Sequence, residues 1–258
     1  MCQFFIISSA EKVDIAPHLR LLFEKGRIHK HGWGLARFTE DGTQIIKEPI
    51  PAPNSESLKL LLKDPIYEKT AFAHVRYATV GDVIIENCHP FKEKDINGRV
   101  WTLMHKGTLF DFEPTRKYFH VQSGSTDSER ILLYLVDRIS VAEKEKGGRL
   151  NFDERFSLLD AQMRLMAVGN RINLAIHDGE IIYLHSNFEN ALYQSRVNNS
   201  LSFCSEPLTE SDPWEKVPLN TLIAIKNGEI IKRGTSHGIT YIDTKDDMRR
   251  LYEIYANL

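Results

Sequence analysis

Cys2 combines two reactive groups: a thiol and, once Met1 is removed, a free α-amine on the same residue. A thiol attacks a carbonyl well only as thiolate, and its unperturbed pKa of about 8.5 means that it needs a base. The α-amine, with an unperturbed pKa of about 7.7–8.0, can take that proton directly or through one water. The residue therefore predicts nucleophilic catalysis with a built-in base, with a small apolar strand residue as the simpler alternative.

Three further residues are of types that hold an amino-acid substrate. Arg76, in AFAHVRYATVG, has a planar guanidinium that suits a carboxylate, and Asp127, in GSTDSE, suits an ammonium group. Gly107, in WTLMHKGTL, allows close approach of the backbone and an N–H donor. A surface ion pair and charge complementarity at a helix end are the alternatives for the two charges. Together with the thiol, these groups match glutamine and other γ-glutamyl compounds.

Each of these residues falls at the end of a predicted element. Aromatic and β-branched runs without a breaker predict the strands, and a Thr126 N-cap with Glu129 three residues later predicts a capping box at the helix that carries Asp127. Gly147-Gly148 ends that helix. The strand predicted over residues 2–8 begins at Cys2. The strands predicted over residues 71–75 and 100–104 lead to Arg76 and Gly107, respectively.

The remaining pattern predicts one domain over residues 1–258, because no repeat or linker interrupts it. We expect an α+β fold with two antiparallel sheets stacked between helix layers. Asp178-Gly179 and Asn227-Gly228 predict hairpin turns. The other predicted helices cover residues 13–25, 55–62, 152–168 and 245–255, and the other strands cover residues 44–47, 173–176, 181–185, 201–204, 221–225 and 229–232. The glycines of HKHGWGLARF, residues 29–38, predict a turn that leads into a further strand.

The order and spacing of several short motifs resemble class II glutamine amidotransferases, in particular the stand-alone YafJ type. The motifs are Met1-Cys2, HKHGWG, HVRYATVG, ENCHPF, HKGTL, TDSE, HDGEIIYLHSN and EPLTESDPWEKV. The resemblance runs nearly end to end. It implies the four-layer αββα fold of N-terminal nucleophile (Ntn) hydrolases. It also implies Cys2 as the nucleophile and Gly107 as an oxyanion N–H donor. The substrate-binding residues it implies are Arg76 for the α-carboxylate, Asp127 for the α-ammonium, and Thr79 and His89 along the pocket.

Lys106 departs from the family pattern, in which His-Asn-Gly stands where this chain has His105-Lys106-Gly107. The family's Asn side chain donates to the oxyanion, whereas Lys106 has three donors and a full charge on a long stem. It either points at the oxyanion or turns to solvent and leaves Gly107 alone. Losing one such donor typically costs about 10²–10³ in turnover. The alternative function is therefore a catalytically impaired γ-glutamyl-binding or regulatory protein.

Composition excludes several other classes of function. A net charge of −2 gives no electrostatic basis for binding nucleic acid or an anionic membrane, and no apolar run approaches the roughly 20 residues that span a bilayer. Three sparse cysteines argue against a disulfide framework and for a cytoplasmic location. The candidate metal ligands lack a known zinc spacing, so neither a metal nor a cofactor is expected. These candidates are His29, His31, His74, Cys88, His89 and His105.

The expected reaction has two steps. Cys2 attacks the γ-carbonyl and releases an amine, and water then cleaves the γ-glutamyl thioester. The sequence contains no evident second catalytic domain that would receive ammonia. Either a separate synthase is the partner that uses the ammonia, or the reaction is hydrolysis of another γ-glutamyl amide or peptide. The sequence leaves the two open.

Overall fold

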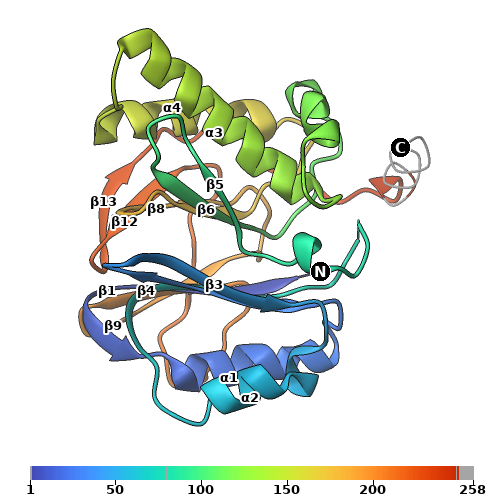
Figure 1. Cartoon of the computed structure of the whole chain (residues 1–258), viewed down its shortest axis with the longest axis vertical. Coiled ribbons are helices and arrows are strands. Elements are labelled where there is room, and N and C mark those ends of the chain that lie inside the picture. Colours follow the sequence, from blue (N-terminus) through green and yellow to red (C-terminus); the bar gives the residue numbers. More distant parts are fainter. Residues whose placement is uncertain (1, 80, 248, 250–258) are drawn as a thin grey trace.

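The computed structural model describes residues 2–79, 81–247 and 249, and its backbone forms four layers (Figure 1). Two β-sheets lie face to face in the middle, and helices cover the outer face of each. Neighbouring strands within both sheets pair antiparallel. The sequence prediction of an α+β sandwich of two antiparallel sheets between helix layers is confirmed.

The lower sheet in Figure 1 has the start of the chain as its central strand. Its strands, in spatial order, are β11 (Glu215–Lys216), β9 (Tyr193–Val197), β10 (Ser200–Cys204), β1 (Gln3–Asp14), β4 (Tyr67–Val75), β2 (Trp33–Thr39) and β3 (Gly42–Glu48). Gln3 pairs with Val75 of β4, and Phe5 pairs with Cys204 of β10. Cys2, the residue before β1, is therefore level with Arg76, the residue after β4, whereas Ser205, the residue after β10, pairs with Phe4.

The upper sheet lies under the long central helix of the chain (Figure 1). Its strands, in spatial order, are β13 (Glu229–Arg233), β12 (Ile223–Lys226), β8 (Ile182–His185), β7 (Leu174–His177), β6 (Val100–His105) and β5 (Phe91–Lys94). The α-helices are α1 (Ala16–Glu24) and α2 (Glu56–Leu61) on the lower sheet, and α3 (Asp127–Lys146) and α4 (Phe152–Met166) on the upper. The 3₁₀ helices are η1 (Lys25–Arg27), η2 (Ala52–Asn54), η3 (Ile85–Asn87) and η4 (Glu113–His120). None of the helices in the described residues is both long and apolar enough to cross a bilayer.

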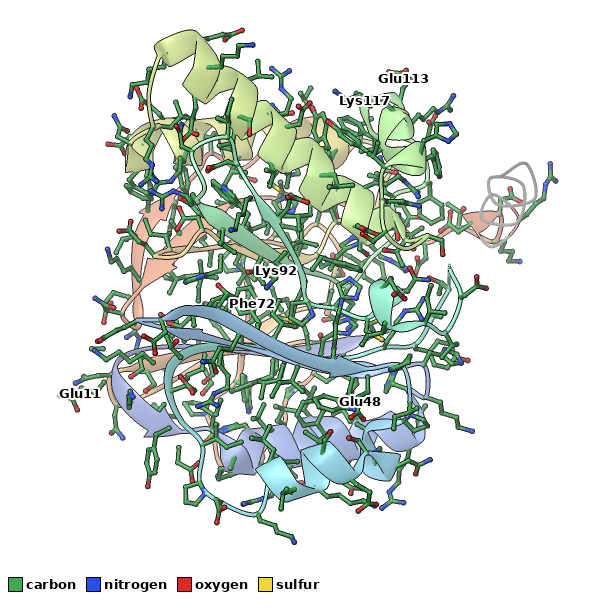
Figure 2. All side chains as sticks on the ribbon, in the orientation of Figure 1. Glu11, Glu48, Phe72, Lys92, Glu113 and Lys117 are labelled. Carbon is green, nitrogen blue, oxygen red and sulfur yellow. The ribbon has the colours of Figure 1, made fainter. Side chains whose placement is uncertain are left out.

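Alternating side chains divide the interior into three apolar clusters. On β1, Phe5 packs in the cluster between the lower sheet and α1, whereas Phe4 packs between the two sheets with Phe72 of β4. Figure 2 shows side chains filling the space between the sheets, with Phe72 labelled among them. A third cluster lies between the upper sheet and helices α3 and α4. Because both faces of these strands are buried, they read in the sequence as continuous apolar runs.

Several element boundaries differ from the predicted ones. Strand β1 continues to Asp14, whose carboxylate accepts hydrogen bonds from the Ala16 and Ile66 N–H groups, so helix α1 begins at Ala16 instead of residue 13. The sequence did not predict β5, β9 or β11, which are short and carry charged residues. The helix predicted over 245–255 lies mostly outside the described residues.

The capping box predicted at α3 is only half present. The Thr126 hydroxyl accepts from the Glu129 N–H at 3.2 Å, but the Glu129 carboxylate accepts from the N–H groups of Ser123 and Gly124 instead of returning to Thr126. The reciprocal capping box is found at α4, between Asn151 and Glu154. The Glu129 carboxylate thus orders the loop that precedes α3 and leads to Asp127.

Gly34 of β2 gives a testable link between packing and stability. A Cβ at Gly34 would overlap the His89 carbonyl oxygen, which is backbone and has little room to shift, whereas a Cβ at Gly148 would meet nothing within 4 Å. We expect Gly34→Ala to lower the free energy of unfolding by about 1–3 kcal/mol and Gly148→Ala to change it by less than about 0.5 kcal/mol. Urea unfolding of both variants measures this difference, and equal midpoints would contradict the close approach.

Candidate active site

Cys2 lies at the end of the lower sheet, directly before β1. Its half-buried thiol accepts a hydrogen bond from the Tyr77 N–H at 3.4 Å and donates to the Tyr77 carbonyl oxygen at 3.5 Å. Burial raises the pKa of this thiol, while the Tyr77 backbone and the nearby Arg76 charge act in the opposite direction. The thiol is thus held in place but needs a base to ionise at neutral pH.

Arg76 follows β4 and is only 2% exposed. Its guanidinium donates to the carbonyl oxygens of Asp82 at 2.9 Å, Gly81 at 3.1 Å and His31 at 3.4 Å. These bonds fix the guanidinium beside Cys2, where its charge favours the thiolate. Thr79 is exposed on the loop that Arg76 holds.

Two residues that sequence reasoning missed hold this loop. The Asn87 amide donates to the Asp82 carbonyl oxygen at 3.0 Å, and its oxygen accepts from the Ser125 N–H at 2.7 Å. His31 Nδ1 accepts from the Ala78 N–H at 2.8 Å. The motifs ENCHPF and HKHGWG contain these residues, but only the fold shows which backbone groups they meet. Asn87 thereby joins the Arg76 loop to the start of α3.

Asp127 is the first residue of α3 and is 6% exposed. Its carboxylate accepts from the Leu109 N–H at 2.8 Å and lies at a helix N-terminus, where negative charge is stabilised. Asp127 is close enough to Cys2 to contribute to the raised pKa of the thiol, and close enough to Arg76 to favour its charged form. The sequence prediction that Asp127 lies in the first turn of a helix agrees with the structure, and its role as an ammonium-binding residue stays a prediction.

Gly107 lies just beyond β6, and the residues on either side of it, Lys106 and Thr108, hydrogen-bond to residues 171–173. The Lys106 N–H donates to the Asn173 carbonyl oxygen at 2.8 Å and the Thr108 N–H donates to the Arg171 carbonyl oxygen at 3.0 Å. Within the described residues, no hydrogen bond of the Gly107 N–H is found. A Cβ here would overlap the Arg171 carbonyl oxygen, so only glycine fits. The role of its N–H as an oxyanion donor stays a prediction.

Lys106 does not turn to solvent, which was one of the two outcomes expected from the sequence. It is 5% exposed, and its ammonium donates to the Ser205 carbonyl oxygen at 3.5 Å. Burial lowers the pKa of Lys106, and the nearby Glu206 and Cys2 act in the opposite direction. Lys106 thus places a cation near Cys2, at the residue that follows β10.

His89 lies in the interior. Its ring contacts the His74 ring with centroids 4.2 Å apart and planes tilted by 31°, and it meets the Phe91 ring edge-on. Neither ring nitrogen of His74 or His89 has a hydrogen-bond partner within the described part of the chain, and burial lowers the pKa of both imidazoles. The pocket-lining role of His89 therefore stays a prediction.

The other cysteines and the metal candidates have different surroundings from Cys2. Cys88 and Cys204 are fully buried, and burial raises their pKa to about 11 and about 12. Residues 2–79, 81–247 and 249 contain no cluster of three or more His, Cys, Asp or Glu side chains suited to a metal ion. Cys2 is thus the thiol that the fold leaves partly accessible.

Comparison with known proteins identifies the family. The chain belongs to the class II glutamine amidotransferases, because a family model described as "Glutamine amidotransferases class-II" matches residues 1–201. The putative glutamine amidotransferase YafJ of Escherichia coli is 27% identical over 245 residues, covering 84% of this chain and 94% of that protein.

Solved structures support the same fold. A predicted glutamine amidotransferase from Pseudomonas aeruginosa matches with a TM-score of 0.64 and 20% identity, covering 90% of this chain and 100% of that one. Glutamine phosphoribosylpyrophosphate (PRPP) amidotransferase from B. subtilis matches with a TM-score of 0.64 and 17% identity, covering 93% of this chain and 50% of that one. The four-layer sandwich described above is thus the Ntn-hydrolase fold of amidotransferases.

The three thiols are predicted to react differently. We expect iodoacetamide to add one label to the folded protein, at Cys2, and three labels after guanidinium unfolding, because Cys88 and Cys204 are fully buried with raised pKa values. Intact-mass spectrometry with peptide mapping counts the labels. Cys2→Ser serves as the control and should take up none while folded. Rapid native labelling of Cys88 would contradict this description.

Proposed function

We propose that the protein hydrolyses glutamine or another γ-glutamyl amide through Cys2 once Met1 is removed. The observation that carries the proposal is the thiol held by the Tyr77 N–H at 3.4 Å, with Arg76 and Asp127 both close enough to influence its pKa. This arrangement combines a positioned nucleophile with one positive and one negative group for an amino-acid head.

The first step forms a thioester. The Cys2 amine takes the thiol proton, and the sulfur attacks the γ-carbonyl carbon. The Gly107 N–H donates to the resulting oxyanion. The amine then returns the proton to the leaving nitrogen as the C–N bond breaks. In the second step water attacks the thioester, the amine takes a water proton, and glutamate and the free thiol are released.

The substrate head is held by charge. Arg76 would attract the α-carboxylate and Asp127 the α-ammonium, and both are buried enough for such contacts to be weakly screened. Asn87 supports the geometry because it joins the loops that carry the two residues. Thr79, exposed on the Arg76 loop, is available to the same head group.

The fate of ammonia defines the partner. The chain of the B. subtilis protein is about twice as long as the part that matches, and its name is glutamine PRPP amidotransferase. The ammonia released here would pass either to a synthase or to water. Hydrolysis requires no such partner and is the simpler activity.

Ammonia release tests the proposal. We expect protein with Met1 removed, confirmed by intact mass, to convert glutamine to glutamate and ammonia, and a diazoketone analogue of glutamine to label Cys2 once. Cys2→Ala should lower turnover by about 10³-fold or more, because the nucleophile is lost. Cys204→Ala is the matched control, since that thiol is buried in the core and should retain turnover. Equal turnover by Cys2→Ala and Cys204→Ala would contradict the proposal.

The second candidate is a γ-glutamyl-binding protein without useful turnover. It is favoured by the Lys106 ammonium, which donates to Ser205 where the family pattern has an oxyanion-donating Asn. Under this alternative, Lys106→Asn would raise glutamine turnover by about 10²–10³-fold. A variant no faster than the wild type would exclude it.

The pH dependence identifies the base. We expect kcat/KM for glutamine to fall about tenfold per pH unit below about 7.7, because the protonated α-amine cannot accept the thiol proton. His29, whose pKa burial lowers to about 4, is neutral over this range and cannot set the midpoint. His29→Gln should therefore leave the midpoint in place, whereas a midpoint that moves with this substitution would identify His29 as the base instead.

A further inference from the structure

The order of strands divides the surroundings of Cys2 into two sides. Arg76 follows β4 and Ser205 follows β10, and β1 lies between these two strands. In the antiparallel register Arg76 is level with Cys2, whereas Ser205 pairs with Phe4, so the two residues lie on opposite sides of β1 and Ser205 is two residues further along it. If the amino-acid head lies on the Arg76 side with its γ-carbonyl at the thiol, the leaving group extends toward Ser205.

Lys106 provides a positive charge on this second side. Lys106 is 5% exposed, and the one hydrogen bond found for its ammonium among the described residues is the 3.5 Å contact with the Ser205 carbonyl oxygen. None of the carboxylates within the described residues lies within 4.0 Å of this ammonium. An ammonium has three donors, so Lys106 has capacity for further acceptors.

Glu206 is the carboxylate that most favours the charged form of Lys106, but it is already bound by other groups. Gln3 Nε2 donates to one oxygen at 2.6 Å, and the Lys25 ammonium binds the other at 2.8 Å. Lys25 and Lys106 thus bring two positive charges against one negative charge on this side of Cys2. Leaving a buried charge without a counter-ion is unfavourable, and an anionic group on the substrate would remove that imbalance.

We propose that Lys106 binds a carboxylate on the leaving amine, so that the protein acts on γ-glutamyl amino acids or peptides in preference to glutamine. The inference rests on the proposed function, because it assumes that the γ-carbonyl lies at Cys2. It assigns the leaving-group side to Lys106, a residue that departs from the family pattern. The products of this hydrolysis are glutamate and the free amino acid or peptide.

Two substrates that differ in one group test the proposal. γ-Glutamylglycine and γ-glutamylglycinamide share the head and the scissile bond, and only the first has a carboxylate on its leaving amine. We expect the wild type to favour γ-glutamylglycine by about 10–100-fold in kcat/KM, the range of a hydrogen bond to a charged group. Lys106→Met should reduce this ratio to about one, and Lys106→Arg should restore part of it.

Lys92→Met is the matched control, because Lys92 is an exposed lysine on β5 (labelled in Figure 2) and should leave the ratio at its wild-type value. Circular dichroism first establishes that Lys106→Met is folded, because a loss of folding would also reduce both rates without changing their ratio. An equal fall of kcat for both substrates in Lys106→Met would place Lys106 at the oxyanion and overturn the proposal. A wild-type ratio near one would overturn it as well.

Binding separates this inference from the proposed function. Calorimetric titration of Cys2→Ala with each compound, with and without Lys106→Met, measures the same preference in Kd and requires no turnover. A Lys106-dependent preference in binding without hydrolysis by the wild type would retain the carboxylate site and reject the enzyme. Hydrolysis of both compounds without any such preference would retain the enzyme and reject the carboxylate site.

Discussion

The antiparallel register of β1 between β4 and β10 is the constraint on which the candidate site depends. Gln3 pairs with Val75, and Phe5 pairs with Cys204, so the chain start is fixed against two strands at once. The side chains of Phe4 and Phe5 are fully buried on opposite faces of the sheet. A register shift by one residue would move Phe4 and Phe5 to the opposite faces of the sheet. The apolar clusters on both faces therefore oppose such a shift and keep Cys2 beside Tyr77.

Burial has opposite effects on the groups around the thiol. It raises the pKa of the Cys2 thiol and lowers the pKa values of Arg76 and Lys106, which disfavours the charged form in each case. The attraction between opposite charges offsets part of this cost. The Arg76 and Lys106 cations favour the thiolate form of Cys2, and the thiolate favours the charged forms of Arg76 and Lys106. Asp127 opposes the thiolate, so binding a substrate ammonium there would also remove a charge that resists ionisation.

Local patterns were sufficient to predict the elements that end at the site. The strands before Arg76 and Gly107 are apolar runs, and the helix at Asp127 has a clear N-cap. The contacts of Asn87 and His31 could not be predicted, because they depend on which backbone atoms the folded loops present. The edge strand β5 and strand β9, which lies next to the edge strand β11, were missed because charged residues interrupt their apolar pattern, and their pairing comes from neighbouring strands.

Replacing a neutral amide by Lys106 changes more than the number of oxyanion donors. A buried ammonium near the thiol favours the thiolate, but it also disfavours protonation of the neighbouring α-amine. The same charge therefore helps the attack and weakens the base that would assist the leaving group. An anionic leaving group would reduce this conflict, because its carboxylate neutralises the ammonium while the amine receives its proton. The Lys106 ammonium contacts Ser205 on the β10 side of β1, whereas Arg76 follows β4 on the other side, and this separation is consistent with such a division of roles.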